Sequence, residues 1–599
     1  MHRSKTWLPL AALSLAVGIE LAPTPAEACG GTFCDGALPT SMPVDQTGET
    51  ILFAIDNGYV EAHVQIEYDG GDADQFAWIV PVPEIPEIEV GSWRLVQAML
   101  DGTVPVYGVQ SRAVCEDSSI GDGGLFLSQP DGGGSTGEDP VVVAKDVVGS
   151  LEYVVLQGGT ADTVTDWLVG SGYAVEDEAP AILDEYIGEG HVFVAFRLRH
   201  GAGVSDIHPV VIRYPGTEPC IPIRLTRVAA KDDMDIRALF LGESRVVPTS
   251  YRHVLLNRAQ LDWPSFGANY RELVTMAVDA PMADGRAFVT EYAGSVSVID
   301  SSRLDTSMLD SSAFDGIPVV DVIDTLEAMG LMLCNEDGCQ WLHELAPSLV
   351  HEFLPVPAGV EEDAFYACLS CYAGLIDPVA WDAAAFAAAF DERIVAPMQH
   401  GQDLLATWPY VTRLYTTISP HEMTVDPMFA ENAGLPDVPS RYGAERQQDC
   451  CGDAMRLPGG RLVWMTGNSW PVWGNDMPWA ERIEEYAPGG GAPIVLDDQS
   501  ATIDAVIDHW NQVADCNGQD TGGWDTGLDD GSGNPGDADG GSNGTTGGTA
   551  GASGTSGSGG GLDGSSSGCG CTTTPMRTDA VGWMLMLLGL GAVARRRRW

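Results

Sequence analysis

Alternating apolar and polar positions mark the clearest element in the first part of the chain. An apolar run over residues 51–55 is followed by Asn57-Gly58, and apolar residues then occupy every second position up to Tyr68. Asn-Gly between two apolar runs is a strong signal for a β-hairpin. A period of two is typical of a strand with one buried face and one face in solvent. The sequence therefore predicts an antiparallel hairpin here and places His63 on its solvent face.

The rest of the chain carries strand-like and helix-like patterns in mixed order. Strands are predicted over residues 76–80, 153–156, 191–199, 209–214, 221–226 and 413–417. Prolines at positions 81 and 83 are expected to end the first of these strands. Helices are predicted over residues 162–169, 180–187, 318–329, 378–396 and 502–513. This mixture indicates an α+β fold.

The balance of elements changes near residue 300. We expect a β-rich N-terminal domain with antiparallel hairpins over residues 29–300, and a more helical, cysteine-containing region over residues 301–516. Residues 517–568 are mostly Gly, Ser, Thr, Asp and Asn, and they cannot bury enough apolar surface to offset the chain entropy. They are predicted to form a disordered Gly/Ser/Asp linker that acts as a flexible tether. A glycine-rich stretch over residues 118–139 is predicted to be a surface loop.

The first 28 residues have the pattern of a secretory signal peptide. Basic residues precede a short apolar run, and a small-x-small site ends at Ala28. The run is shorter than the roughly 20 residues that a permanent membrane span needs. We predict export with cleavage after Ala28. Lipidation of the new first residue, Cys29, stays open as an alternative.

The C-terminus combines an apolar run with a cluster of arginines. Residues 580–594 are apolar, and Arg595–Arg598 follow them. Arginines behind an apolar helix hold that end in the cytoplasm. The helix would be about 22 Å long, whereas a typical hydrocarbon core is about 30 Å thick. A short transmembrane helix that serves as a processing signal is therefore favoured over a permanent anchor.

The order of features over residues 569–599 resembles the MYXO-CTERM sorting signal. A Gly/Ser-rich stalk leads to Cys569 and Cys571, and a short apolar helix and terminal arginines follow. The resemblance implies cleavage near one of these two cysteines, loss of the helix, and display on the cell surface through a lipid on that cysteine.

Several segments of the N-terminal half are similar to a bacterial domain-of-unknown-function family, number 2330. The likeness covers roughly residues 29–300 and depends on the order of several motifs. Those motifs are Ala28-Cys29-Gly30-Gly31-Thr32-Phe33-Cys34, Phe76-Ala77-Trp78-Ile79-Val80-Pro81-Val82-Pro83, Asp166-Trp167-Leu168, Gly190-His191-Val192-Phe193-Val194 and Pro219-Cys220-Ile221-Pro222-Ile223-Arg224-Leu225-Thr226. The resemblance implies no catalytic roles, because the family carries no established activity.

The charge balance excludes one large class of partners. The 599 residues include 85 Asp and Glu but only 30 Lys and Arg, which gives a formal net charge of −55. Such a charge repels the phosphates of nucleic acids, so no nucleic-acid partner is expected. For the same reason, membrane contact is expected only through the C-terminal tail.

The cysteines of the exported body are expected to form disulfides. An oxidising compartment favours pairing, and Cys334 and Cys339 flank a turn sequence that suits a local bridge. Together with Cys368 and Cys371 they also make a C-x4-C and C-x2-C set, which would indicate zinc in a cytosolic chain. Disulfides are favoured over zinc here because of the compartment. The connectivity stays open.

No catalytic, cofactor or metal motif is recognisable in the sequence. One cluster suggests a ligand: four tryptophans lie in a stretch rich in Gly, Asn and Pro, and aromatic platforms of this kind can bind sugars. They are Trp464, Trp470, Trp473 and Trp479. The alternative is that they fill a core.

The sequence therefore predicts an exported, cell-surface protein, membrane-anchored through its C-terminus, with a binding or envelope-structural role rather than an enzymatic one. Its expected partners are the export and C-terminal sorting machinery and an envelope or extracellular polysaccharide. A carbohydrate-binding or hydrolytic surface protein is the alternative.

Overall fold

The computed structural model describes most of the chain between its predicted terminal segments. The described residues are 31–33, 45–56, 58–69, 77–113, 141–171, 178–198, 207–335, 338–377, 381–449, 452–466 and 469–514. The predicted signal peptide, the 118–139 loop, the linker and the C-terminal tail lie outside them. None of the helices in these ranges combines the length and apolar character of a membrane span.

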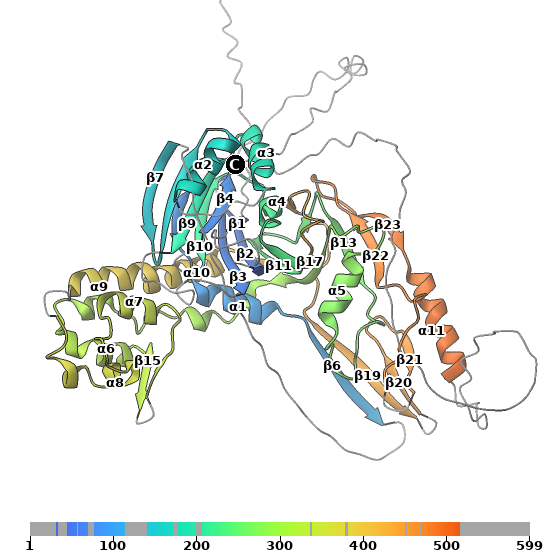
Figure 1. The fold of residues 1–599 in the computed structure, drawn as a ribbon. Helices are drawn as coiled ribbons and strands as arrows, with labels where there is room; N and C mark the ends of the chain where they lie inside the picture. The colour runs from blue at the N-terminus through green and yellow to red at the C-terminus, as the bar shows by residue number, and fades with distance from the viewer. Residues whose placement is uncertain are drawn as a thin grey trace, which may run out of the picture.

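A mixed ten-stranded sheet runs through the centre of the molecule (Figure 1). In spatial order its strands are β23 (Ile494–Asp498), β22 (Ala480–Glu485), β13 (Arg252–Leu256), β14 (Ala287–Ser295), β17 (Tyr410–Ile418), β11 (Ala230–Gly242), β2 (Asp45–Asp56), β3 (Tyr59–Asp69), β10 (Val210–Pro215) and β5 (Glu87–Val90). Two neighbouring pairs are parallel, β11 with β2 and β13 with β14, and the other pairs are antiparallel. The fold is therefore α+β with antiparallel hairpins, as predicted.

The predicted hairpin is formed by β2 and β3. The two strands are antiparallel from Asp45 and Asp69 to Asp56 and Tyr59. Gly58 has a φ of +80°, a conformation that glycine adopts without steric cost. This explains why the turn sequence predicts the hairpin correctly.

A second, five-stranded antiparallel sheet packs on the first. Its strands are β1 (Gly31–Phe33), β4 (Ala77–Val82), β9 (Val192–Leu198), β8 (Leu151–Gln157) and β7 (Val141–Val148). Trp78 stacks on Phe196 with ring centroids 4.9 Å apart, and both side chains join the core that includes Ile51 and Phe53 of the large sheet. Helices α2 (Ala161–Ser171) and α3 (Ala179–Glu189) lie against the other face of the five-stranded sheet (Figure 1). Because β9 is buried on both faces, its sequence is almost continuously apolar.

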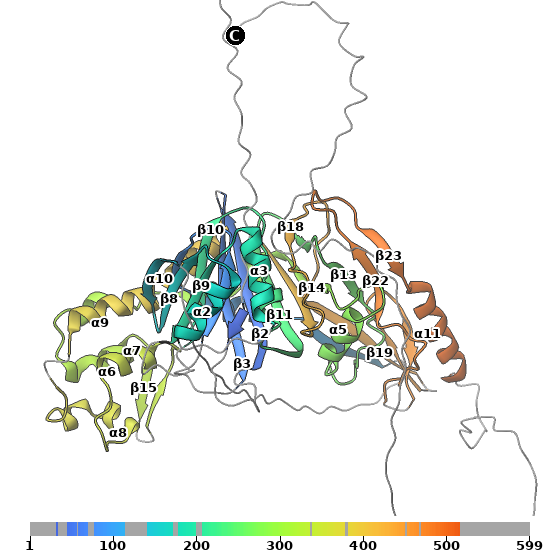
Figure 2. The same cartoon turned by 45° about the horizontal axis from the view of Figure 1, so that its top comes forward.

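A four-stranded sheet forms the opposite end of the molecule (Figure 2). It contains β21 (Leu462–Trp464), β20 (Gly452–Arg456), β19 (Arg441–Asp449) and β6 (Val106–Ala113). Helices α5 (Tyr270–Val278) and α11 (Ser500–Ala514) share a second core with it, which includes Trp263, Leu273 and Ile503. The helix predicted over residues 502–513 is thus confirmed as α11.

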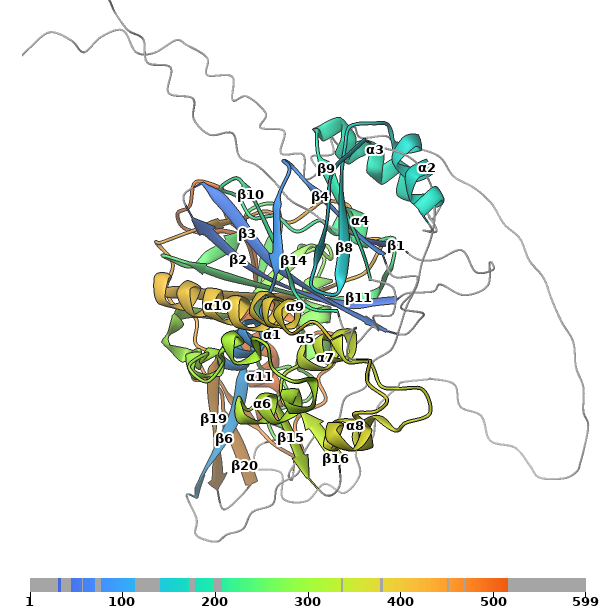
Figure 3. The same ribbon diagram turned by 90° about the vertical axis from the view of Figure 1, so that its left-hand side faces the viewer.

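A helical part follows the first fourteen strands and lies below the large sheet (Figure 3). Its elements are η3 (Val296–Val298), η4 (Ser301–Leu304), η5 (Ser311–Phe314), η6 (Val319–Asp321), α6 (Val322–Ala328), β15 (Met332–Asn335), β16 (Gly338–Trp341), α7 (Ala346–Phe353), α8 (Glu362–Ala367), η7 (Leu369–Tyr372), α9 (Ala383–Phe390), the π-helical turn η8 (Asp391–Val395) and α10 (Ala396–Thr407). Helix α10 lies beside α1 (Trp93–Thr103), and Gly401 allows close contact with Leu95 of that helix.

The region after residue 300 also contributes strands to the central sheet. The predicted strand over residues 413–417 is confirmed as part of β17, which pairs with β11 and β14. A short pair, β12 (Val246–Pro248) and β18 (Phe429–Glu431), joins the same two parts of the chain. The proposed division at residue 300 stays a prediction, but the largest sheet takes strands from both sides of it.

Two predictions about prolines are wrong. Residues 223–226 form a helical turn, α4 (Ile223–Thr226), rather than a strand. Pro222 precedes this turn, and proline suits the start of a helix. Strand β4 continues through Pro81 to Val82, because β1 pairs only as far as Ile79 and leaves Pro81 with a described strand on one side.

The position of His63 is also corrected. Its side chain is 1% exposed, not on a solvent face. Helix α10 covers this face of β3, and His400 of that helix reaches the same strand. The alternating pattern indicates a strand correctly, but it carries no information about a helix more than 300 residues away that covers its polar face.

Candidate ligand-binding cavity

A cavity of about 340 Å³ lies between the ten-stranded and four-stranded sheets. Strands β13, β14 and β22 provide its polar side chains. Tyr107 of β6 and Tyr442 of β19 provide part of an aromatic wall, and residues 435–438 close another side. This volume is in the range of small-molecule sites.

A chain of hydrogen-bonding groups crosses the cavity from Arg245 to Glu484. Nη2 of Arg245 donates to Oγ1 of Thr290 over 3.0 Å, and Nε2 of His253 lies 2.9 Å from the same oxygen. Nδ1 of His253 lies 3.4 Å from Oε2 of Glu484. The arrangement places a hydroxyl, an imidazole and a carboxylate in sequence.

Burial controls the protonation of this chain. Burial lowers the pKa of His253 below its ordinary value, although Glu484 opposes the shift. Burial acts to raise the pKa of Glu484, but hydrogen bonding from His253 and the positive charges of His253 and Arg482 outweigh it and lower that pKa. The folded protein therefore favours a neutral imidazole beside an ionised carboxylate.

Two arginines of the cavity have no carboxylate partner in the described part of the chain. Arg245, which is 6% exposed, donates to the carbonyl of Pro436 and to Thr290. The guanidinium of Arg258 lies 4.0 Å from the ring centroid of Tyr442. The Nε atoms of both arginines are buried and make no hydrogen bond. A buried cation without a counter-charge is costly, and this chain has nearly three acidic residues for each basic one.

The remaining wall is aromatic and rigid. The rings of Tyr107 and Tyr442 stack with centroids 5.6 Å apart, and Tyr270 lies 5.5 Å from Tyr107. The hydroxyl of Tyr270 donates to Glu291 over 2.8 Å, and Glu291 forms a buried ion pair with Arg413. The acids on this side thus have partners within the protein, and burial raises the pKa of Tyr270.

A comparison with protein families identifies the first half of the chain. The model of the family described as "Uncharacterized protein conserved in bacteria (DUF2330)" matches residues 23–317. These residues belong to the DUF2330 family. No curated protein matches the chain, and no solved structure does.

The cavity is not contained within the DUF2330 segment. Arg245, His253 and Arg258 belong to that segment, whereas Tyr442 and Glu484 come from later in the chain. Sequence analysis missed these residues because they come from separate strands and share no spacing. The one available signal is the scarcity of basic residues, which makes each buried arginine informative.

The four predicted tryptophans lie outside the cavity lining and pack around the second core. Trp470 and Trp473 both donate their indole N–H groups to the carbonyl of Ala259, over 3.1 and 2.7 Å. Trp510, which the sequence analysis did not single out, lies 5.7 Å from Trp473 and donates to the carbonyl of Trp464. Trp479 packs against the same core. The sugar platform stays a prediction.

Disulfides are confirmed at both local cysteine motifs. Cys334 pairs with Cys339 across β15 and β16, and Cys368 pairs with Cys371. These pairings correct the zinc alternative, because the four sulfur atoms are already bonded in pairs. Cys220 is disulfide-bonded as well. The tail cysteines Cys569 and Cys571 lie outside the described residues.

Proposed function

We propose that this protein is an exported, surface-anchored binding protein whose cavity takes a small organic anion. The observation that carries the proposal is the pair of buried arginines, Arg245 and Arg258, that line one cavity without a carboxylate partner among the described residues. A carboxylate or phosphate group on the ligand would supply the missing counter-charge.

The rest of the cavity defines the ligand further. Stacked tyrosines offer flat apolar surface, and the volume of about 340 Å³ suits a molecule the size of a ring with one or two substituents. The ligand class is therefore a small anion with an aromatic or apolar body. The signal-like N-terminus and the MYXO-CTERM-like tail support export and display, with the export and sorting machinery as transient partners.

The test compares charged and neutral ligands of one shape. We expect benzoate or phenyl phosphate to bind the purified chain in isothermal titration and benzamide not to bind. Arg258→Gln should weaken anion binding at least tenfold, because it removes a charge-assisted contact. Arg441→Gln is the matched control, since Arg441 is exposed and lies outside the cavity. Equal anion affinity in the wild-type chain and Arg258→Gln, or no anion binding across the panel, would contradict the proposal.

Hydrolysis is the second candidate, and the order of Thr290, His253 and Glu484 favours it. In acyl transfer, the Thr290 oxygen would bond to the acyl carbon while Nε2 of His253 takes the hydroxyl proton and then gives it to the leaving group. Water would release the acyl group in the second half of the cycle. Covalent labelling of Thr290 by a fluorophosphonate probe, absent in Thr290→Val, would support this function. Absence of labelling in the wild-type chain would exclude it.

A further inference from the structure

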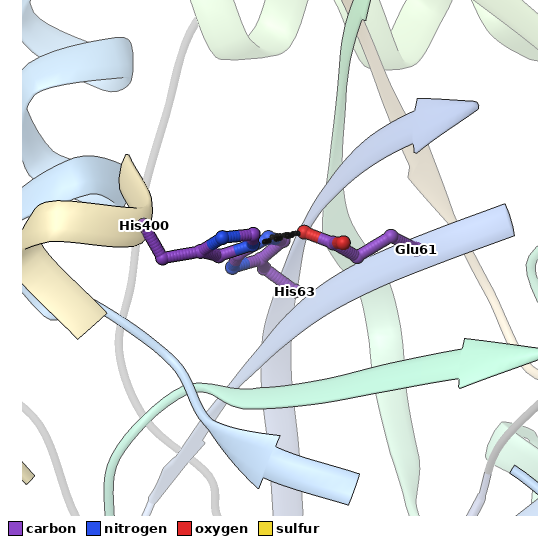
Figure 4. A group of neighbouring side chains, drawn as sticks. All are labelled: Glu61, His63 and His400. Atoms are coloured by element: carbon purple, nitrogen blue, oxygen red, sulfur yellow. Dashed lines mark hydrogen bonds and ion pairs between the residues drawn. The ribbon is translucent and has the colours of Figure 1, made fainter. Parts of the chain in front are cut away.

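A second cluster of chemically active side chains lies where the helical part meets the large sheet (Figure 4). Glu61 and His63 are two residues apart on β3, so both side chains lie on the same face of the sheet. His400 comes from α10, which covers that face. Two segments that are more than 300 residues apart thus bring two imidazoles and one carboxylate together.

The three side chains converge on one point. Nε2 of His63 lies 2.8 Å from Oε1 of Glu61, and Nε2 of His400 lies 2.6 Å from the same oxygen. The two imidazole rings are stacked, with centroids 5.7 Å apart and an interplanar angle of 13°. One ligand atom from each residue lies within 4.8 Å of the others. Figure 4 shows both rings pointing toward the carboxylate.

We propose that Glu61, His63 and His400 bind a divalent transition-metal ion, of which zinc is the first candidate. Imidazole nitrogen with a carboxylate oxygen is a ligand set that zinc accepts, whereas calcium and magnesium prefer oxygen alone. Three protein ligands leave one position of a tetrahedral ion for water. This site is separate from the anion cavity and does not depend on the proposed function.

The surroundings favour a cation and allow it to enter. Glu89 and Asp403 lie close enough to His400 to add negative potential there. The His400 side chain is 38% exposed, whereas that of His63 is 1% exposed. Zinc ligands in a tetrahedral site lie about 3.3 Å apart, from bond lengths near 2.0 Å. The ligand atoms therefore need to separate by about 0.6 Å, and the partly exposed His400 has room for that adjustment.

Such an ion would fasten α10 to β3. We expect one zinc ion to bind per chain in isothermal titration with zinc chloride, in buffer with excess calcium to occupy unspecific acidic sites. Zinc should also raise the unfolding temperature, since a ligand that binds only the folded chain stabilises it. Cobalt in place of zinc should give the visible absorption bands of a four- or five-coordinate site.

The variants separate this site from other histidine–carboxylate pairs. His400→Ala should weaken zinc binding at least tenfold and remove the thermal shift, and Glu61→Gln should do the same while keeping the shape of the side chain. His351→Ala is the matched control, because His351 contacts Glu362 over 3.0 Å at an exposed position with no third ligand. Circular dichroism checks that each variant is folded. Equal zinc affinity in the wild-type chain and in folded His400→Ala or Glu61→Gln would overturn the assignment.

Discussion

Arg224 and Asp426 form a buried ion pair, with Nε of the arginine 2.6 Å from Oδ2 of the aspartate. The other carboxylate oxygen of Asp426 accepts the backbone N–H of Arg224 over 2.8 Å, and the hydroxyl of Tyr186 donates to Oδ2 over 2.9 Å. Glu189 provides a second acid for the guanidinium. Because Asp426 lies beyond the DUF2330 segment, this network joins that segment to the later part of the chain.

Removal of the Asp426 carboxylate should therefore be strongly destabilising. Asp426→Ala leaves Arg224 buried with one partner fewer, and breaking a buried pair on one side costs about 3–5 kcal/mol. Urea unfolding of the variant measures this loss. The control is Glu178→Gln, which removes the exposed partner of Arg227 and should cost less than about 1 kcal/mol. Equal losses in the two variants would show that the network is not important for stability.

Local patterns predicted most of the elements correctly. The Asn-Gly turn predicted the β2–β3 hairpin, and helical periodicity predicted α2, α3, α6 and α11 close to their observed bounds. These features depend on residues that are neighbours in sequence, which is why they are readable. The strand predicted over residues 221–226 failed because a continuous apolar run does not distinguish a buried strand from a buried helical turn.

The sites depend on contacts that no local pattern contains. His63 looks like a solvent-facing residue until α10 is placed over β3. The cavity residues Arg245, His253 and Glu484 come from distant parts of the chain that meet only in the ten-stranded sheet. Periodicity specifies which face a residue occupies, but the partner of that face is decided by tertiary packing.

Glu49 should make stability depend on pH. It lies on β2 in line with Ile51 and Phe53, between the two main sheets, and burial raises its pKa to about 8 from 4.5. Because the folded state favours the protonated form, its contribution is greatest below pH 4.5 and is lost as pH rises toward 8, by roughly 1 kcal/mol per pH unit. Glu49→Gln should remove this dependence. Unfolding free energies across that range test it, and an unchanged slope would contradict it.

The two local disulfides should resist labelling and contribute modestly to stability. Alkylation of the denatured, unreduced chain should leave Cys334, Cys339, Cys368 and Cys371 unmodified, and peptide mapping should show the two short-range links. Each closes a very short loop, so replacing both members of one pair with serine should cost about 2 kcal/mol by loop entropy. Reactive thiols at these four positions would contradict the pairing.

His253 should make the fold less stable in mild acid. Because burial lowers its pKa below the ordinary 6.5, the folded chain resists protonation that the unfolded chain accepts. The contribution is complete above pH 6.5 and is lost as pH falls below it, by roughly 1 kcal/mol per unit. The groups that face the ring are Thr290, Glu484, Arg245, Arg482 and Tyr486.

The measurement is the difference in unfolding free energy between about pH 7.5 and about pH 5.5. His253→Gln should reduce this difference by the share of one proton, while keeping a polar contact with Thr290. Some dependence should remain, because burial lowers the pKa of His208 and lowers that of His343 to about 3. His351→Gln, at an exposed position, serves as the control. If His253→Gln and His351→Gln change the slope equally, then the buried histidine is not the group that responds, and its neutral state in the cavity is disproved.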